Sequence, residues 1–390
     1  METSFRNDTP EWLGQVPRTW SIAPAWTLFG ERNELADSDA THLTPSRHFG
    51  VISQIEYAKL TGHRPNQNPL TADNMKAVCP GDFVISMGSH ESGIEYSRVP
   101  GKVSNDYRVL VPSELVHKEY FKWFLKSKPF IAGLLGLTTE IRKGQRIHYS
   151  RFALLQLPLP PLDTQRAIAD YLDRETSEID AMLDKLDGLG RLLEERRTNA
   201  CAETVKNLAP SAPWVQCKLL CHINTGSGDT QDSNENGTYP FYVRSQTPQR
   251  YDDWEFDGEA VLTAGDGAGV GKVFHLVNEK FMAHQRVYVL NEFRGVTAPY
   301  FYHVFKWLFP NAAKDGSAKN TVDSVRQPMI ANLKVPLPPL DEQERIVAHL
   351  DETTARIDAM LAKTQQLKDL LTERRSALIT AAVTGQIEVH

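Results

Sequence analysis

The stretch PLPPLDTQRAIADYLDRETSEIDAMLDKLDGLGRLLEERR at residues 158–197 returns as PLPPLDEQERIVAHLDETTARIDAMLAKTQQLKDLLTERR at residues 336–375. The two copies align without a gap at a constant offset of 178 residues. They share the opening Pro-Leu-Pro-Pro-Leu-Asp, the run Ile-Asp-Ala-Met-Leu and the closing Glu-Arg-Arg. A repeat of this length indicates an internal duplication.

Apolar residues recur in each copy three, four or seven positions apart, which is typical of a coiled-coil seam. Proline cannot stand inside a helix, so each helix is expected to begin just after Pro-Pro-Leu, with Asp163 and Asp341 as N-caps. Each helix then has one apolar stripe that needs a partner. The predicted seam comprises Ile168, Leu172, Ile179, Met182, Leu186, Leu189 and Leu193 in the first copy and Ile346, Leu350, Ile357, Met360, Leu367, Leu371 and Leu378 in the second.

The bulk composition is that of a soluble globular protein with more than one domain. The chain has 390 residues, of which 41% are hydrophobic and 24% charged. No apolar run approaches the ~20 residues that span a bilayer, and the first residues lack the apolar core of a signal peptide. The four cysteines show no CxxC spacing, which favours buried, reduced thiols over a disulfide framework or a metal site. We therefore expect a cytoplasmic protein with no membrane segment and no metal.

The net charge of −6 argues against a nucleic-acid binder until its distribution is considered. The two repeated segments, 158–208 and 336–390, hold seven more acidic than basic side chains, whereas the rest of the chain holds one more basic than acidic. The acidity therefore belongs to the surface of the helices. The remaining segments are neutral enough for local basic clusters to approach phosphate.

The segments between the repeats read as mixed α and β. In the first, GDFVIS at 81–86 and YRVLVP at 107–112 resemble strands, and a helix is expected near 118–125. The second follows the same plan with GEAVLTAG, QRVYVL and YFYHVFKWL. We therefore predict an α+β protein made of two related halves, divided into globular segments 1–157 and 209–335 and helical segments 158–208 and 336–390.

These motifs resemble the specificity subunit of type I DNA restriction-modification enzymes, and the resemblance covers essentially the whole chain. It rests on the two PLPPLD openings of long helices and on three further stretches. These are WLGQVPRTW at 12–20, GTYPFYV at 237–243 and DGEAVLTAGDGAGVGKV at 257–273.

The resemblance implies two target-recognition domains, formed by segments 1–157 and 209–335, which we call the recognition segments. It also implies two helices packed as an antiparallel coiled coil with pseudo-two-fold symmetry. Each recognition domain would read one half of an asymmetric, bipartite site in double-stranded DNA. The helices would set the spacer and dock two modification (methyltransferase) subunits, which two restriction (translocase-nuclease) subunits would join. S-adenosylmethionine, ATP and magnesium are expected on those partners, and no cofactor on this chain. The alternative is a duplicated coiled-coil scaffold without DNA readout.

A search of the sequence for catalytic motifs finds none. The glycine-rich run at 265–273 departs from a phosphate-binding P-loop, because Asp266 stands where the first glycine belongs and Val273 follows Lys272. A hairpin tip is the interpretation we adopt for it. The Asn-Pro-Pro-aromatic motif of amino-methyltransferases is absent too. We therefore expect the chain to be non-catalytic.

Candidate DNA-contacting residues are loop side chains able to bond phosphates or base edges, although each could equally be a solvated surface group. Six aromatic residues could stack on bases, but their helical spacing favours core packing: Tyr120, Phe121, Trp123, Tyr300, Phe301 and Trp307. The DNA-contacting candidates are Ser89, His90, Arg98, Lys102, Arg142, Lys143, Gln145 and Arg146 in the first half, and Gln246, Arg250, Asp266, Lys272, Lys319 and Asn320 in the second.

Overall fold

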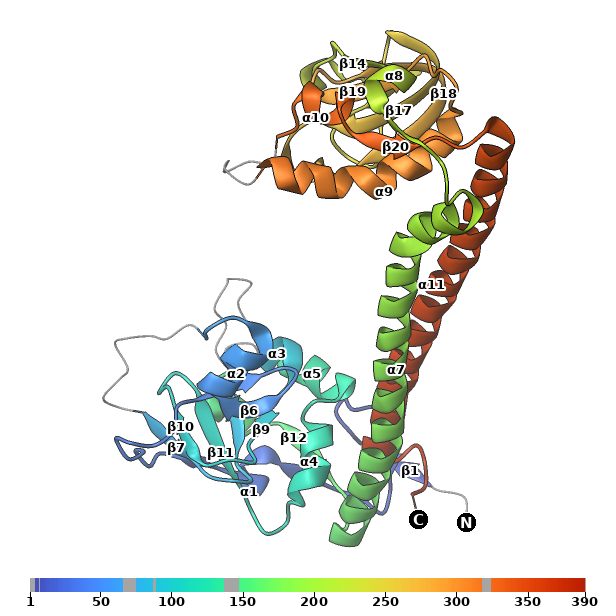
Figure 1. Cartoon of the computed structure of the whole chain (residues 1–390). Helices are drawn as coiled ribbons and strands as arrows, with labels where there is room; N and C mark the ends of the chain where they lie inside the picture. The colour runs from blue at the N-terminus through green and yellow to red at the C-terminus, as the bar shows by residue number, and fades with distance from the viewer. Residues whose placement is uncertain are drawn as a thin grey trace. The chain divides into compact units, whose positions relative to one another are not determined.

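The computed structural model describes residues 4–6, 8–65, 75–86, 89–136, 147–317 and 324–389. The chain forms two compact units: unit 1 comprises residues 1–185 and 366–390, and unit 2 comprises residues 186–365. Both boundaries fall inside the long helices α7 (Leu162–Leu208) and α11 (Leu340–Val383), which pack together (Figure 1). Each unit therefore combines one recognition segment with part of each long helix.

Unit 1 is built on a four-stranded antiparallel sheet in the order β4-β11-β8-β9. Its strands are β4 (Phe29–Arg32), β8 (Phe83–Ile85), β9 (Glu95–Tyr96) and β11 (Arg108–Pro112). Four antiparallel pairs surround it: β1 (Phe5–Arg6) with β2 (Val16–Pro17), β3 (Ser21–Pro24) with β12 (Gln156–Leu159), β5 (Leu43–Ser46) with β6 (Gly50–Ser53), and β7 (Lys76–Val78) with β10 (Gly101–Val103). Because β12 leads directly into α7, its pairing with β3 fixes the start of that helix to the recognition segment.

The helices of unit 1 are α1 (Ala25–Leu28), α2 (Gln54–Thr61), α3 (Ser89–Ser92), α4 (Lys118–Phe124), α5 (Lys128–Leu135) and α6 (Tyr149–Phe152). Tyr120 and Phe121 of α4 are fully buried in the core of the unit. Leu172 of α7 and Val383 of α11 belong to the same core, and the Tyr120 hydroxyl donates to the carbonyl of Val383 at 3.2 Å. The helix segments are thus part of the folded unit.

Unit 2 is built on a six-stranded sheet in the order β14-β19-β17-β18-β15-β16, in which only the β15–β18 pair is parallel. The strands are β14 (His222–Thr225), β15 (Tyr239–Tyr242), β16 (Gln249–Tyr251), β17 (Phe256–Ala264), β18 (Phe274–Ala283) and β19 (Val287–Asn291). A separate pair joins β13 (Trp214–Gln216) to β20 (Lys334–Pro336), which leads into α11.

The helices of unit 2 are α8 (Cys217–Leu220), α9 (Ala298–Ser317) and α10 (Gln327–Ala331), with the short 3₁₀ helices η2 (Thr230–Asp232) and η3 (Gly267–Gly269). Along α9, Phe301, Phe305 and Phe309 stack in sequence with centroid separations of 5.5 and 4.7 Å. These rings are buried with Ile346 and Leu350 of α11. Unit 2 therefore also includes the long helices in its core.

Most local predictions are confirmed. The helix expected near 118–125 is α4, and the four strand-like runs overlap β8, β11, β17 and β19. The glycine-rich run connects β17 to β18 as a hairpin, with Gly267 and Gly271 at positive φ. The N-cap prediction is wrong by one or two positions, because the long helices already begin at Leu162 and Leu340. Asp163 and Asp341 lie in the first turn instead, where a carboxylate stabilises the helix dipole.

The predicted seam is only partly correct. The buried members are Ile168, Leu172, Ile179, Leu193, Ile346, Leu350, Ile357 and Leu371, while Leu186 and Leu378 are half-buried. Met182, Leu189, Met360 and Leu367 are exposed. Thr176 and Thr364 are buried instead, because each hydroxyl donates to the carbonyl four residues before it and so needs no solvent.

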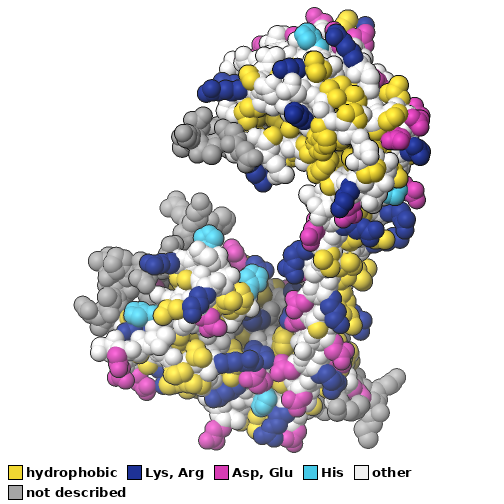
Figure 2. All heavy atoms as spheres, viewed as in Figure 1, with side chains coloured by type: hydrophobic (Ala, Val, Ile, Leu, Met, Phe, Trp, Pro, Cys, Tyr) yellow, Lys and Arg dark blue, Asp and Glu magenta, His cyan; other side chains and the backbone are white. Residues whose placement is uncertain are grey.

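The exposed apolar residues of the long helices follow the internal repeat. Adding Leu192 and Leu370, which are also exposed, gives three pairs at the 178-residue offset, all between 44% and 64% exposed. In a helix, positions three or seven residues apart lie on one side. Figure 2 shows hydrophobic side chains at the surface of the helical segment. We call Met182, Leu189 and Leu192 the first apolar stripe and Met360, Leu367 and Leu370 the second.

Two ion pairs show that the helices pair antiparallel and symmetrically. In unit 1, Arg375 bonds Asp180 through two hydrogen bonds of 2.8 and 3.1 Å. In unit 2, Arg197 lies 3.1 Å from Asp358. The offset of 178 residues turns Asp180 into Asp358 and Arg197 into Arg375, so the two contacts are the same contact in the two copies. Such reciprocal pairing is the signature of a two-fold interface.

The recognition segments join the helices through equivalent contacts as well. The buried Gln165 accepts a hydrogen bond from the backbone N–H of His117 at 2.8 Å, and Gln343 accepts one from Thr297 at 2.9 Å. Asp173, the counterpart of Asp351, accepts from the indole N–H of a tryptophan on α4 at 2.8 Å, while Asp351 pairs with a histidine of α9 at 3.0 Å. Each recognition segment therefore packs on its helices in the same way.

Three of the four cysteines are buried. Cys201, Cys217 and Cys221 are buried free thiols as predicted, and burial raises the pKa of Cys201 and Cys221 to about 12. Cys79 is exposed, contrary to the prediction, because it lies in the turn before β8.

Within the described ranges, none of the helices has the length and apolarity of a bilayer-spanning helix. The same residues contain no group of three or more His, Cys, Asp or Glu that could hold a metal ion.

Candidate nucleic-acid interface

The loops at one edge of the unit 2 sheet bring together polar side chains from the ends of five strands. Strands β14, β15 and β17 end at this edge, and the turn 284–286 between β18 and β19 lies there too, since Ala264 pairs with Val287 and Tyr242 with Ala283. We call this the reading edge of unit 2. It includes loops 226–229, 243–247 and 265–273.

A carboxylate shared by two arginines is the main polar feature of the reading edge. Asp266 accepts a hydrogen bond from Nη1 of Arg244 at 2.9 Å and another from Nη1 of Arg286. The Asp266 side chain is 15% exposed, whereas those of Arg244 and Arg286 are 44% and 60% exposed. Each guanidinium group is therefore held by Asp266 at Nη1, while much of its side chain is exposed to solvent.

The protonation of this group is fixed by its neighbours. Burial raises the pKa of Asp266, but the hydrogen bonds from Arg286 and Arg244 outweigh burial and hold that pKa below its ordinary value. Burial, together with the charge of Arg244, lowers the pKa of His284. Asp266 is thus ionised and His284 neutral at pH 7, so the cluster of Arg244, Asp266 and Arg286 carries two positive charges and one negative charge.

Glycines permit the close packing of the reading-edge loops. A Cβ atom on Gly226 would lie 2.0 Å from the carbonyl oxygen of Ala283, and one on Gly269 would lie 2.6 Å from that of Arg244. Any side chain there would push loop backbones apart. The loops can therefore hold the arginines in place only because these positions lack a Cβ.

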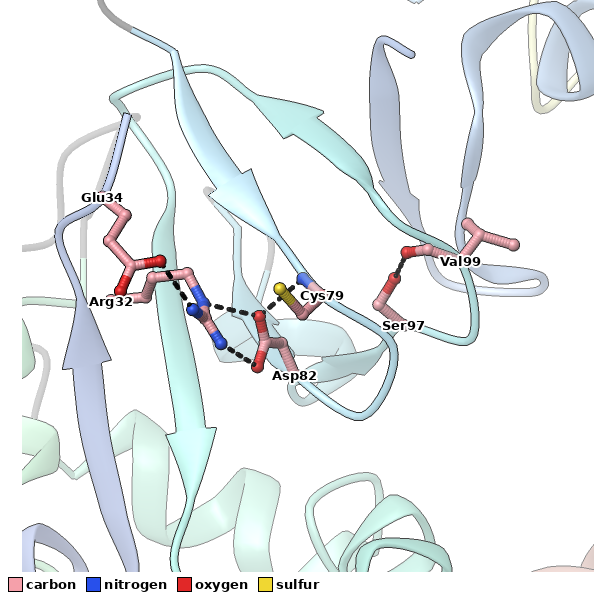
Figure 3. Close-up of polar contacts among 6 residues, drawn as sticks. All are labelled: Arg32, Glu34, Cys79, Asp82, Ser97 and Val99. Carbon is pink, nitrogen blue, oxygen red and sulfur yellow. Dashed lines mark hydrogen bonds and ion pairs between the residues drawn. The ribbon is translucent and has the colours of Figure 1, made fainter. Parts of the chain in front are cut away.

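The corresponding edge of unit 1 also holds arginines against carboxylates. Arg108, which corresponds to Arg286 at the 178-residue offset, lies 3.7 Å from Glu31 of β4, and Lys76 lies 3.2 Å from the same carboxylate. Arg32 bonds Asp82 through two hydrogen bonds of 2.9 and 3.1 Å, as Figure 3 shows. The Asp82 side chain is almost completely buried, so this last pair stabilises the fold.

Comparison with known sequences finds a family that resembles most of unit 2. Residues 214–369 match the family described as the type I restriction modification DNA specificity domain. This part of the chain is therefore similar to type I DNA specificity domains. The match includes the whole unit 2 sheet, helix α9 and the first two-thirds of α11.

Relatives with this domain are specificity subunits. The chain is 28% identical over 176 residues to the EcoDI specificity subunit of Escherichia coli, covering 45% of this chain and only 38% of that relative. It is 28% identical over 363 residues to the StySPI specificity subunit of Salmonella potsdam, covering 80% of this chain and 75% of that one. The chain is thus similar to type I restriction enzyme specificity subunits along most of its length.

Solved structures extend the likeness to the fold of the whole chain. A chain of a type I R-M system matches with a TM-score of 0.70 at 17% identity, covering 95% of this chain and 99% of the other. The HsdS subunit of Thermoanaerobacter tengcongensis matches with a TM-score of 0.55 at 17% identity, covering 95% and 98%. The predicted fold class, with two α/β recognition segments and two paired long helices, is confirmed.

The candidate residues of unit 2 are partly gathered at its reading edge. Gln246, Asp266 and Lys272 lie on its loops, and Gln246 also donates to the carbonyl of Phe274 at 3.3 Å. Arg250 lies on β16, away from the edge, and donates to the carbonyl of Thr238 at 3.2 Å. Lys319 and Asn320 lie outside the described residues.

The candidate residues of unit 1 are more dispersed. Ser89 and Lys102 are buried: Ser89 accepts from the N–H of Ser86 at 2.8 Å, and Lys102 donates to the carbonyl of Ser38 at 2.6 Å. Their polar groups are already used inside the protein. Arg98 is exposed and lies 3.6 Å from Glu119. The side chain of His90 and the residues Arg142, Lys143, Gln145 and Arg146 lie outside what the structure describes.

Sequence reasoning did not select Arg244 and Arg286. Arg286 lies within the predicted strand QRVYVL, and Arg244 directly follows the motif GTYPFYV, so neither falls in the loops from which the candidates were chosen. A useful signal was available, because strand ends in one sheet meet at a shared edge. The aromatic prediction is confirmed for Tyr120, Phe121, Tyr300 and Phe301, which are fully buried, while Trp123 and Trp307 pack against the cores partly exposed.

A large groove on unit 2 has the opposite character. It has a volume of about 1020 Å³ and lies between the far ends of β17 and β19 and the start of α11. Five carboxylates line it, those of Asp257, Glu259, Glu292, Glu344 and Asp351. Negative side chains repel phosphate. This part of the domain is therefore unsuited to DNA, which leaves the reading edge as the candidate interface.

Proposed function

We propose that this chain is the sequence-specific DNA-binding subunit of a type I restriction-modification complex. Each recognition segment reads one half of an asymmetric, bipartite duplex site. The long helices set the spacer between the halves and dock two modification subunits, to which two restriction subunits bind. A function on cellular DNA places the chain in the cytoplasm.

The observation that carries this proposal is the symmetric attachment of two diverged segments to two copies of one repeated helix. The ion pairs Asp180–Arg375 and Arg197–Asp358 are one contact used twice. Each recognition segment then meets its helices through a buried glutamine at the same place in the repeat. A duplicated frame that carries two different sheets suits a site with two different halves.

The repeated apolar stripes support docking of a partner present in two copies. Exposed Met and Leu side chains that gather on one helix face are a common mark of a protein interface. The first and second stripes carry the same residue types at the same positions of the repeat. Two identical partner subunits could therefore bind in the same way, one on each stripe.

Recognition without catalysis is the chemistry that the reading edges support. Exposed arginines held by carboxylates can contact phosphates and base edges. The polar groups found there bind and orient, and the sequence holds no motif of a methyltransferase or a nuclease. S-adenosylmethionine, ATP and magnesium then belong to the partner subunits, which supply methyl transfer, translocation and cleavage.

The competing interpretation is a duplicated scaffold that binds two partner proteins and no DNA. A binding titration of the full chain with a modification subunit against random duplex DNA separates the two. The DNA-binding subunit is expected to bind with an affinity that falls steeply and log-linearly with salt, since each phosphate contact releases counterions. A scaffold would show no salt-dependent binding beyond that of the modification subunit alone.

A further inference from the structure

We propose that Arg244 and Arg286 read guanine in the half-site of unit 2 and that Asp266 is the positioning residue that orients them. This inference rests on the proposed function and specifies which residues perform it. The three side chains form one cluster at the reading edge, from the end of β15, the loop after β17 and the turn between β18 and β19.

The two arginines are held in positions that suit the reading of a base. Within the described ranges, Asp266 is the one hydrogen-bonding partner of either guanidinium, and it engages Nη1 of each. The Nε and Nη2 donors of both arginines therefore remain for a ligand. Guanine offers O6 and N7 in the major groove as two adjacent acceptors, which match a guanidinium fork.

The backbone beneath Arg286 is also fixed. Its N–H donates to Nδ1 of His284 at 3.0 Å, and its carbonyl accepts from the N–H of Gly265 at 2.8 Å. His284 is buried, and its N–H donates to the carbonyl of Tyr242 at 3.0 Å. The lowered pKa of His284 keeps its ring neutral, and the hydrogen bond from Arg286 selects the tautomer whose Nδ1 carries no proton. A side chain rooted in such a turn loses little freedom on binding.

Asp266 lowers the net positive charge of the cluster but fixes the direction of both arginine side chains. Two arginines without a carboxylate would attract phosphate more strongly, because phosphate affinity follows the number of positive charges. Asp266 cancels one of the two charges and fixes the direction of both side chains. A site selected for phosphate attraction alone would not include that carboxylate, whereas a base reader benefits from it.

The test begins with the site that the wild-type complex methylates, so that binding by the wild type is established first. Duplexes then carry 7-deazaguanine, which lacks the N7 acceptor, at each guanine of the unit 2 half-site in turn. Binding is measured for the full chain with its modification subunit, as wild type and as Arg244→Lys and Arg286→Lys, which keep the charge. Arg294→Lys is the matched control, because Arg294 is exposed beyond the far end of β19.

At one or two guanines, replacement by 7-deazaguanine is expected to lower the affinity of the wild-type complex for the duplex about tenfold or more. The same modification should lower the affinity little further in the variant in which lysine replaces the arginine that reads that guanine. Arg294→Lys should behave like the wild type. Slopes of affinity against salt should be unchanged in all three variants, because the number of charges is unchanged.

Asp266→Asn is an independent test, because it should change base discrimination and affinity for random duplex in opposite directions. Removing the carboxylate should lower discrimination between the correct and a substituted guanine, yet raise affinity for random duplex, since one negative charge is lost. Thermal melting of each variant checks that it is folded. A half-site without guanine, a full deazaguanine penalty retained in both lysine variants, or a uniform loss on all duplexes would overturn the assignment. A wild-type complex that binds no DNA would instead refute the proposed function itself.

Discussion

Leu172→Asp is expected to abolish stable folding of unit 1. Leu172 is fully buried and packs with residues of α4 and α11 in one core. An unpaired carboxylate there costs several kcal/mol, which is a large part of the ~5–15 kcal/mol that stabilises an ordinary domain. The measurement is thermal unfolding followed by circular dichroism, together with the yield of soluble protein.

Two comparisons sharpen this prediction. Leu154→Asp changes a position that is 73% exposed in the same unit. Its free energy of unfolding should lie within about 0.5 kcal/mol of that of the wild type. Leu350→Asp, the equivalent of Leu172 in the repeat, should be as damaging in unit 2, because Leu350 is equally buried. A Leu172→Asp protein that melts like the wild type would show that the helix segment does not belong to the core.

Lengthening α7 is expected to lengthen the spacer of the recognised DNA site. A helix rises ~1.5 Å per residue, so four residues inserted after Leu193 add about 6 Å of helix. Duplex DNA advances ~3.4 Å per base pair, which limits the change to about two base pairs. We expect one added base pair, since an oblique crossing lowers the gain and four residues disturb the heptad as a stutter. Both half-sites should keep their bases.

The antiparallel pairing supplies a second insertion variant. The two symmetric ion pairs imply that the position after Leu193 lies opposite the position after Leu361. Inserting four residues at both places keeps the helices in register on either side, so a folding defect of the single insertion can be separated from the spacing effect. Methylation mapping in one host compares both variants with the wild type. An active variant with an unchanged gap, or with new bases in either half, would contradict the spacer role of the helix.

The fold was accessible from the sequence because its main signal is a repeat. The 178-residue offset predicted the two helices, and proline placed their starts within one or two residues. The glycine-rich run was predicted to be a hairpin because its spacing does not fit a phosphate-binding loop. Heptad spacing did not separate buried from exposed apolar positions, so Met182 was assigned to the seam while Thr176 was overlooked. Burial depends on which neighbours pack on each face, and one helix sequence does not contain that information.

The candidate site was less accessible, because residue type alone does not show where a side chain points. Lys102 looked like a surface cation but is buried against a backbone carbonyl. Arg244 and Arg286 looked like strand residues but are exposed at the strand ends, joined by Asp266. Their meeting depends on strand order and register, in particular the parallel β15–β18 pair, which no local pattern predicts.

The most direct test of the central claim, that each unit reads one half of the DNA site, is an exchange of recognition segments. Residues 209–335 are replaced by the matching segment of a relative with a different site, and methylated positions are mapped genome-wide in cells that also carry the modification subunit. The account predicts new bases in one half of the methylated sequence, with the other half and the gap unchanged. Altered bases in both halves, or an unaltered site, would contradict it.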